Sequence, residues 1–196
     1  ALDSLLKDKS VLHISLADPV KKVCLWYEEV FRNIGNMPHD TATGPAPKMD
    51  QLWESILPKR LIMTFNVEGF SVPKLEERLT DLTEQDIFHP RVVLLDGLPF
   101  DDTVRNALTD LKSLAESQSF SVWFTVRTHR DGELDPHGLP LPFSEVSDLF
   151  QVAFQLQPEE KEIRLNVIKG GNSVSGHPPL LLDPSTMLIK DTGSAD

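Results

Sequence analysis

A run of aliphatic residues that ends in a carboxylate constrains the fold of this chain more than any other feature. Residues 92–95 read Val-Val-Leu-Leu and are followed directly by Asp96 and Gly97. Four apolar residues without alternation indicate a strand that is buried on both faces, as in a parallel sheet covered by helices. Such a strand delivers Asp96 to its carboxyl end, which is the edge where open α/β sheets bind ligands.

The segments around this strand predict an alternation of strands and helices. Apolar runs predict strands at 11–16, 61–65 and 120–126, the last too apolar for an exposed sheet, and helical periodicity predicts helices at 1–6, 19–34, 50–56, 73–82 and 103–117. The helix at 19–34 has the clearest period, with Asp18 as its predicted N-cap, Pro19 as its first residue and Gly35 at its end. Helices between strands imply crossover connections, so we expect an α/β fold with a mainly parallel sheet flanked by helices.

The last part of the chain has a different pattern. Residues 150–156 and 163–168 flank a charged turn at 158–162 and predict a C-terminal antiparallel hairpin, with further short strands at 180–182 and 187–190. Residues 36–49, 131–142 and 170–179 are rich in proline, glycine and polar residues and predict loops. We expect one domain over 1–190, incomplete at its N-terminus, and a disordered tail at 191–196.

Composition narrows the classes of partner and compartment. The formal net charge of -11 disfavours sequence-independent binding of nucleic acid, although a local basic patch would still allow it. The single cysteine, Cys24, excludes an intramolecular disulfide and predicts a cytoplasmic protein. No apolar run is long enough to predict a membrane span. Because the first residue is Ala1 and no signal peptide is recognisable, we expect that the gene product begins earlier.

Asp96 is the leading candidate for chemistry. A carboxylate at a strand end can hold the Mg²⁺ of a nucleotide, usually through water, because this cation prefers oxygen ligands. Taken alone, an aspartate at a strand end is more often a helix cap or a turn residue, and it is the context of Asp96 that favours the role in metal binding. A phosphorylated receiver domain is a further alternative, but the first predicted strand lacks the acidic pair that a receiver needs.

Several of these motifs, taken in order, resemble the core of the RecA/KaiC-type ATPases. They are the strand that ends Ile14-Ser15-Leu16, the Asp96 strand, the strand Trp123-Phe124-Thr125 and the closing hairpin at 163–170. The resemblance spans roughly residues 1–171 and implies a RecA-like P-loop NTPase fold. It also implies that Asp96 occupies the position of the Walker B aspartate, with ATP and Mg²⁺ as cofactors.

Two departures from the family pattern concern catalysis. The chain contains no Gly-x-x-x-x-Gly-Lys-Ser/Thr loop to hold phosphates, and the family carries this loop just upstream of where the sequence begins, so truncation is the preferred explanation. The family's catalytic glutamate is replaced by Ala17, with Asp18 one position later as a shorter substitute. The residues present are therefore not expected to hydrolyse ATP, and whether a longer chain does so stays open.

The resemblance assigns roles to four more residues. Thr125 and Arg127 fall in the region of the family's sensor residues, and the alternative is an ordinary polar strand end. Arg164 and Lys169 fall near the basic finger residues that reach the nucleotide of a neighbouring subunit, and the alternative is a solvated strand end. A cation in that position would stabilise charge on the transferring phosphoryl group.

Two functions follow from the resemblance. The first is the nucleotide-binding domain of a bacterial-type ATPase that forms homo-oligomers through RecA-type interfaces. The second is a degenerate ATPase fold that serves as an oligomerisation or adaptor module for an unknown protein partner, which Ala17 favours. The family carries its P-loop strand beside the strand that ends near Thr125, so we expect a gap in the sheet there unless an upstream segment fills it.

Overall fold

The computed structural model describes residues 1–37, 48–128, 132–141, 143–170 and 180–190. The predicted tail at 191–196 lies outside these residues, as do most of the predicted loops at 36–49 and 170–179 and the two end residues of the loop at 131–142. Contacts between residues divide the chain into two compact units. The first comprises Ala1–Phe31 and Pro38–Arg127, and the second comprises Arg32–Met37 and Thr128–Asp196.

The first unit is built on a four-stranded sheet. Its strands are β1 (Val11–Ser15), β2 (Arg60–Thr64), β3 (Val92–Asp96) and β4 (Ser121–Phe124). They lie in the order β2-β1-β3-β4, and every neighbouring pair is parallel. The predicted parallel sheet is confirmed, and β1 and β3 are its two central strands.

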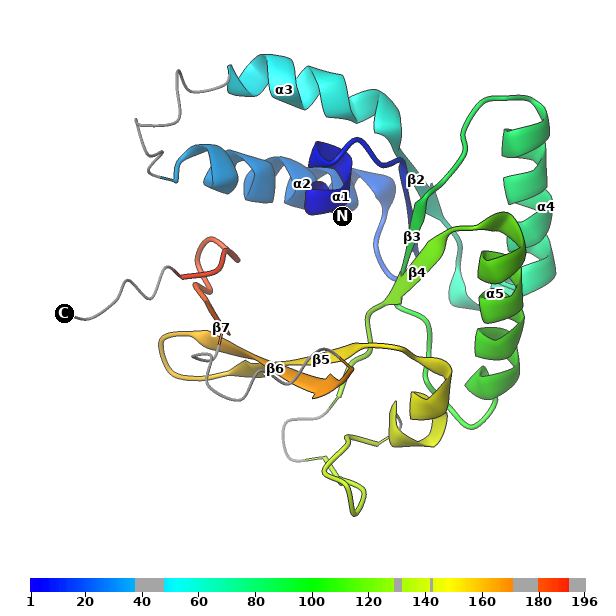
Figure 1. Ribbon diagram of the computed structural model, residues 1–196, viewed down its shortest axis with the longest axis vertical. Helices are drawn as coiled ribbons and strands as arrows, with labels where there is room; N and C mark the ends of the chain where they lie inside the picture. Colours follow the sequence, from blue (N-terminus) through cyan, green and yellow to red (C-terminus); the bar gives the residue numbers. More distant parts are fainter. Residues whose placement is uncertain (38–47, 129–131, 142, 171–179, 191–196) are drawn as a thin grey trace. The chain divides into compact units, whose positions relative to one another are not determined.

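Helices cover both faces of this sheet (Figure 1). They are α1 (Leu2–Leu6), α2 (Val20–Gly35), α3 (Met49–Ile56), α4 (Val72–Glu84) and α5 (Val104–Gln118), with short 3-10 turns at Leu57–Lys59 and Val67–Gly69. Buried residues of α1, α2 and α3 pack on one face, and those of α4 and α5 pack on the other. The predicted arrangement of a sheet flanked by helices is therefore confirmed.

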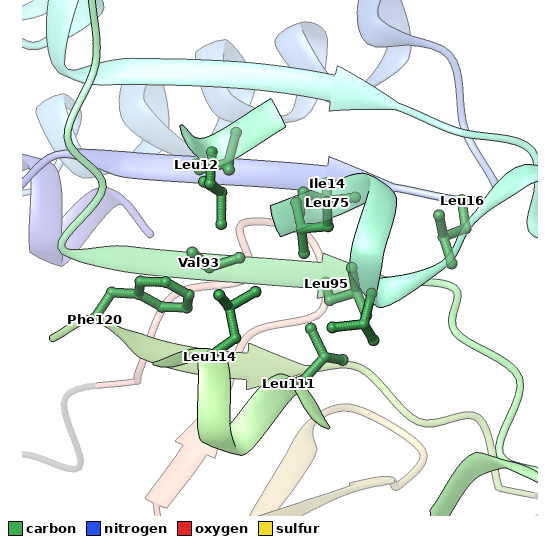
Figure 2. Close-up of a cluster of buried hydrophobic side chains, with 11 residues drawn as sticks. Leu12, Ile14, Leu16, Leu75, Val93, Leu95, Leu111, Leu114 and Phe120 are labelled. Atoms are coloured by element: carbon green, nitrogen blue, oxygen red, sulfur yellow. The ribbon is translucent and has the colours of Figure 1, made fainter. Parts of the chain in front are cut away.

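The larger core lies between the sheet and the helices α4 and α5 (Figure 2). Alternate residues of the central strands point into it, as the twofold repeat of a strand requires. The helices contribute leucines at helical spacing, and Phe120 closes the cluster beside α5. The fully buried members are Leu12, Ile14, Leu75, Leu79, Val93, Leu95 and Leu111.

Strand β4 differs from its prediction. It is shorter than 120–126, and Ser121 and Trp123 are exposed, whereas a buried strand was expected. The reason lies in the strand order, because β4 is the terminal strand of the four and has β3 as its neighbour in the sheet. The predicted gap within the sheet is not found among the described strands, because the four are contiguous; a strand beside the one that ends near Thr125 would have to lie beyond β4.

The second unit contains a separate antiparallel sheet. A 3-10 helix, η4 (Phe143–Leu149), precedes β5 (Ala153–Pro158), β6 (Ile163–Lys169) and β7 (Leu180–Leu182), which pair in the order β5-β6-β7. The predicted hairpin is confirmed, but it forms a sheet of its own. The predicted strand at 187–190 is reduced to a single bridge between Leu182 and Ile189.

Among the described helices, none is both long enough and apolar enough to span a membrane.

Candidate functional site

Four polar residues lie at the carboxyl ends of neighbouring strands in the four-stranded sheet. Ser15, the last residue of β1, is in register with Thr64 on one side and with Asp96 on the other. Thr125 follows β4 directly, and its backbone N–H donates to Leu95 of β3 at 3.3 Å. Because the parallel strands end in register, polar residues from four distant segments lie next to one another at this edge. The sequence predicts this position for Asp96 and Thr125.

A side-chain hydrogen bond joins the ends of β3 and β4. The hydroxyl of Thr125 donates to Oδ1 of Asp96. On the other side of β3, the backbone N–H of Leu16 donates to the carbonyl of Asp96 at 2.8 Å. Asp96 is half-buried; its carboxylate is held by Thr125 and its backbone carbonyl by Leu16, so the orientation of the carboxylate is restricted in the absence of a ligand.

Asp18 lies at the same edge, in the turn between β1 and α2. Its backbone N–H donates to the buried Ser15 hydroxyl at 3.0 Å, and its carboxylate accepts from Nζ of Lys22 at 2.6 Å. The Asp18 side chain is 14% exposed and that of Lys22 is 52% exposed. Instead of the predicted capping of α2, the Asp18 carboxylate forms an ion pair with Lys22, one helical turn away. The backbone N–H groups of Lys22 and Val23 donate to the Pro19 carbonyl.

Ala17 packs closely against Gly97, the residue that follows Asp96. A β-carbon added to Gly97 would lie 3.0 Å from the Ala17 β-carbon and 3.2 Å from its backbone nitrogen. Gly97 has φ of +83°, which favours glycine. The side chain at position 17 therefore starts beside the Asp96 turn, and the exposed Ala17 puts a methyl group where the family resemblance implies a glutamate.

The contacts described above do not include the three remaining candidates. Arg127 is exposed, two residues beyond Thr125, at the end of the first unit. Arg164 belongs to the second unit, where its Nε donates to Glu159 at 2.7 Å; this hydrogen bond lowers the pKa of the Glu159 carboxyl and raises the pKa of Arg164. Lys169, also in the second unit, donates from Nζ to the carbonyl of Ser147 in η4.

The oxygen atoms at this edge could bind Mg²⁺ only together with further ligands, such as water and phosphate oxygens. Asp96 offers a carboxylate and Thr125 a hydroxyl, which are the hard donors that this cation prefers. Within the described residues, however, no group of three His, Cys, Asp or Glu side chains could hold a metal ion. The edge therefore fits a water-mediated magnesium anchor that also uses phosphate oxygens, and it does not fit an all-protein metal cage.

Sequence reasoning overlooked three residues of this edge. Lys22 could have been found from its spacing, because residues four apart on a helix are neighbours. Ser15 is the one buried polar residue among the described side chains, and its bond to the Asp18 backbone depends on the turn that follows β1. The contact of Gly97 with Ala17 joins distant segments and leaves no local signal.

Comparison with known proteins finds no family model that matches the chain and no curated protein that is similar to it.

Proposed function

We propose that the carboxyl edge of the four-stranded sheet is the nucleotide-binding edge of a RecA/KaiC-type ATPase core, with Asp96 as the anchor for the magnesium ion of ATP. The bond between Asp96 and Thr125 carries this proposal. It joins the two strand ends to which the family resemblance assigns the Walker B aspartate and the sensor residue. The order β2-β1-β3-β4 is compatible with the proposal, since β4 is the terminal strand of the four and the family's phosphate-loop strand would lie beside it.

Each candidate residue has a role under this proposal. Asp96 holds the cation through water, Thr125 orients the carboxylate, and Arg127 senses the terminal phosphate. Asp18 takes the part of the missing glutamate, but its arm is shorter and its carboxylate is engaged by Lys22. Arg164 and Lys169 act as basic finger residues toward the nucleotide of a neighbouring copy, because an added cation stabilises the charge of a phosphoryl group in transfer.

A degenerate fold that works as an oligomerisation or adaptor module is the second candidate. Ala17 favours it, because a methyl group beside the Asp96 turn cannot orient water. The sequence also contains no phosphate-binding loop of its own. The 196 residues by themselves are therefore expected to bind nucleotide weakly or not at all, and the choice between the two functions depends on the natural gene product.

The test is calorimetric titration of the natural gene product, its mass determined first, with ATP in the presence and absence of Mg²⁺. Binding that strengthens with Mg²⁺ is expected for the ATPase core. Asp96→Asn keeps the shape and the acceptor for Thr125 but removes the charge, so the effect of Mg²⁺ should disappear. Asp81→Asn, a change at an exposed carboxylate of α4, is the matched control and should leave the effect unchanged.

Three outcomes separate the two candidates. If ATP does not bind to a product that carries a phosphate loop, or if Asp96→Asn keeps the full effect of Mg²⁺, the nucleotide site is wrong. If the product has no phosphate loop, binds no ATP and self-associates, the adaptor function becomes the better account. If ATP binds with Mg²⁺ but is not hydrolysed, Ala17→Glu tests whether the missing carboxylate is the cause.

A further inference from the structure

A histidine that has no role in the proposed site lies in the middle of the central strand β1. His13 is in register with Ile62 of β2 and with Leu94 of β3, so sheet backbone lies on both of its sides. The neighbouring positions Leu12 and Ile14 point into the core beneath α4 and α5. The side chain of His13 therefore points to the opposite face, toward α2.

The imidazole of His13 binds a tyrosine of α2. Its Nδ1 lies 3.1 Å from the hydroxyl of Tyr27, and the two rings meet edge to face at a centroid distance of 5.7 Å. Tyr27 is only 5% exposed and belongs to the core on this face of the sheet. The pair is thus a direct side-chain connection between the central strand and the middle of α2.

Arg60 lies over the ring of the same tyrosine. Its guanidinium lies 4.7 Å from the centroid of the Tyr27 ring and 5.4 Å from that of Trp53 in α3. Its Nη2 also lies 3.8 Å from the sulfur of Cys24, one helical turn before Tyr27. A permanent positive charge is therefore stacked on the ring whose hydroxyl binds His13.

Two nitrogens of this cluster are buried without a hydrogen-bond partner in the structure. They are Nε2 of His13 and Nη1 of Arg60. A neutral imidazole can leave one nitrogen unpaired at moderate cost, but an imidazolium carries a proton on both nitrogens and needs an acceptor for each. The cluster therefore favours the neutral form of His13, because it offers no hydrogen-bond acceptor for the proton that the charged form carries on Nε2.

Groups on several elements around His13 decide its charge. Burial lowers the pKa of His13 most, the carboxylate of Asp96 on β3 raises it, and the amino group of Ala1 and the guanidinium of Arg60 on β2 lower it. On α2, the facing titratable groups are Tyr27 and Cys24, and burial raises the pKa of Tyr27. A single carboxylate therefore opposes burial and two cations.

We propose that the cluster of His13, Tyr27 and Arg60 is an acid-sensitive clamp that holds α2 on the sheet while His13 is neutral and loosens it when His13 takes up a proton. The proton comes from solvent and binds the imidazole nitrogen that is unprotonated in the neutral ring. The positive charge of Arg60 then repels the imidazolium, which also needs water at Nε2. Water reaches that atom only if the α2 side of the core opens.

The sign of the pH effect follows from linkage. A solvent-exposed histidine titrates near pH ~6.5, and His13 in the folded chain titrates lower. Between these two pH values the open or unfolded chain binds more protons than the closed chain. The closed state therefore loses stability as the pH falls from about 6.5 through the pKa of folded His13, and it is unaffected by this group above that window.

The experiment follows two signals in the full chain from about pH 7.5 to about pH 5.5, the range in which histidine changes charge. NMR titration gives the pKa of His13 directly, and it should lie below the ordinary histidine value of about 6.5. Hydrogen exchange, corrected for the intrinsic effect of pH, should show that amides in the middle of α2 lose protection by up to about tenfold at the lower pH.

Two variants and a control make the test specific. His13→Asn keeps a polar group near the Tyr27 hydroxyl and cannot take up a proton, so α2 should lose no protection on acidification. His13→Gln serves the same purpose if the asparagine variant does not fold. His89→Asn removes an exposed histidine that pairs with Asp86 at 2.8 Å, and the acid effect on α2 should persist in this variant.

Either of two results would overturn the clamp. One is a His13 pKa at or above about 6.5, the ordinary value of histidine, which would show that the cluster accepts the charged form. The other is an equal loss of α2 protection on acidification in the wild type and in the His13 variant that folds. This test is made without ATP and Mg²⁺ and does not require Asp96 to bind a cation, so failure of the clamp and failure of the proposed nucleotide site are distinguishable.

Discussion

Gly97 and Ala17, from the turns after β3 and β1, lie so close that a β-carbon on Gly97 would come within 3.0 Å of the Ala17 β-carbon. The two turns belong to neighbouring strands at the carboxyl edge of the sheet. This contact fixes how the chain leaves Asp96, because Gly97 has φ of +83° and no side chain. The geometry of the candidate site thus depends on a residue that has no chemistry of its own.

Gly97→Ala should destabilise the first unit by about 1–3 kcal/mol, because alanine is strained at positive φ and meets Ala17. Urea unfolding at equilibrium measures the loss. Ala17→Gly in the same chain removes the closest contact and should recover part of it, while the strain at position 97 remains. A Gly97→Ala variant as stable as the wild type would contradict the close packing of the two turns.

The hydrogen bond between Thr125 and Asp96 predicts a difference between two substitutions. Thr125→Val keeps the shape of the side chain but removes the donor, and it should cost about 1 kcal/mol, less than is usual for a charged acceptor because Thr125 is exposed. Thr125→Ser keeps the hydroxyl and should cost less. Denaturant midpoints at constant slope give both values. Equal losses for valine and serine would show that the hydroxyl contributes nothing.

Tyr27 predicts how the fold responds to alkali. Burial raises the pKa of its hydroxyl, whereas the unfolded chain ionises near pH ~10. Above that pH the unfolded chain binds fewer protons than the folded chain, so the unfolding free energy falls as the pH rises. Tyr27 is the one tyrosine in the sequence, so the near-ultraviolet absorbance of phenolate reports this residue alone.

The phenolate absorbance of Tyr27 should therefore appear together with the loss of helical circular dichroism. Phenolate absorbance near pH ~10 in a chain with intact helices would show that Tyr27 is accessible, contrary to its burial. Tyr27→Phe is the control, since its unfolding free energy should fall less steeply over the same pH range.

The core beneath α4 and α5 predicts a contrast between a buried and an exposed aliphatic residue. Leu75→Ala should lower the unfolding free energy by about 2–5 kcal/mol, because Leu75 is fully buried and its removal leaves a cavity. Ile87→Ala, at a residue 63% exposed, should change it by less than about 0.5 kcal/mol. Thermal and urea unfolding compare the two, and similar losses would contradict the location of the core.

Local patterns in the sequence were sufficient for most of the elements. The 3.6-residue period of α2 indicates its buried face, and the aliphatic run before Asp96 indicates a strand that is buried on both faces. The charged turn between β5 and β6 indicates where two paired strands are connected. Because these signals come from neighbouring residues, they predict helices, strands and a parallel sheet without knowledge of the partners. They also place Asp96 and Thr125 at strand ends.

The tertiary structure decided which segments become neighbours. The terminal position of β4, the separate sheet of β5, β6 and β7, and the contact of Gly97 with Ala17 depend on pairings between distant parts of the chain. The same holds for His13, whose place between Tyr27 and the sheet follows from the packing of α2. The free energy of a contact between two distant segments depends on both of them. The residue pattern of either segment alone therefore does not predict the pairing, and the folded chain shows which pairs form.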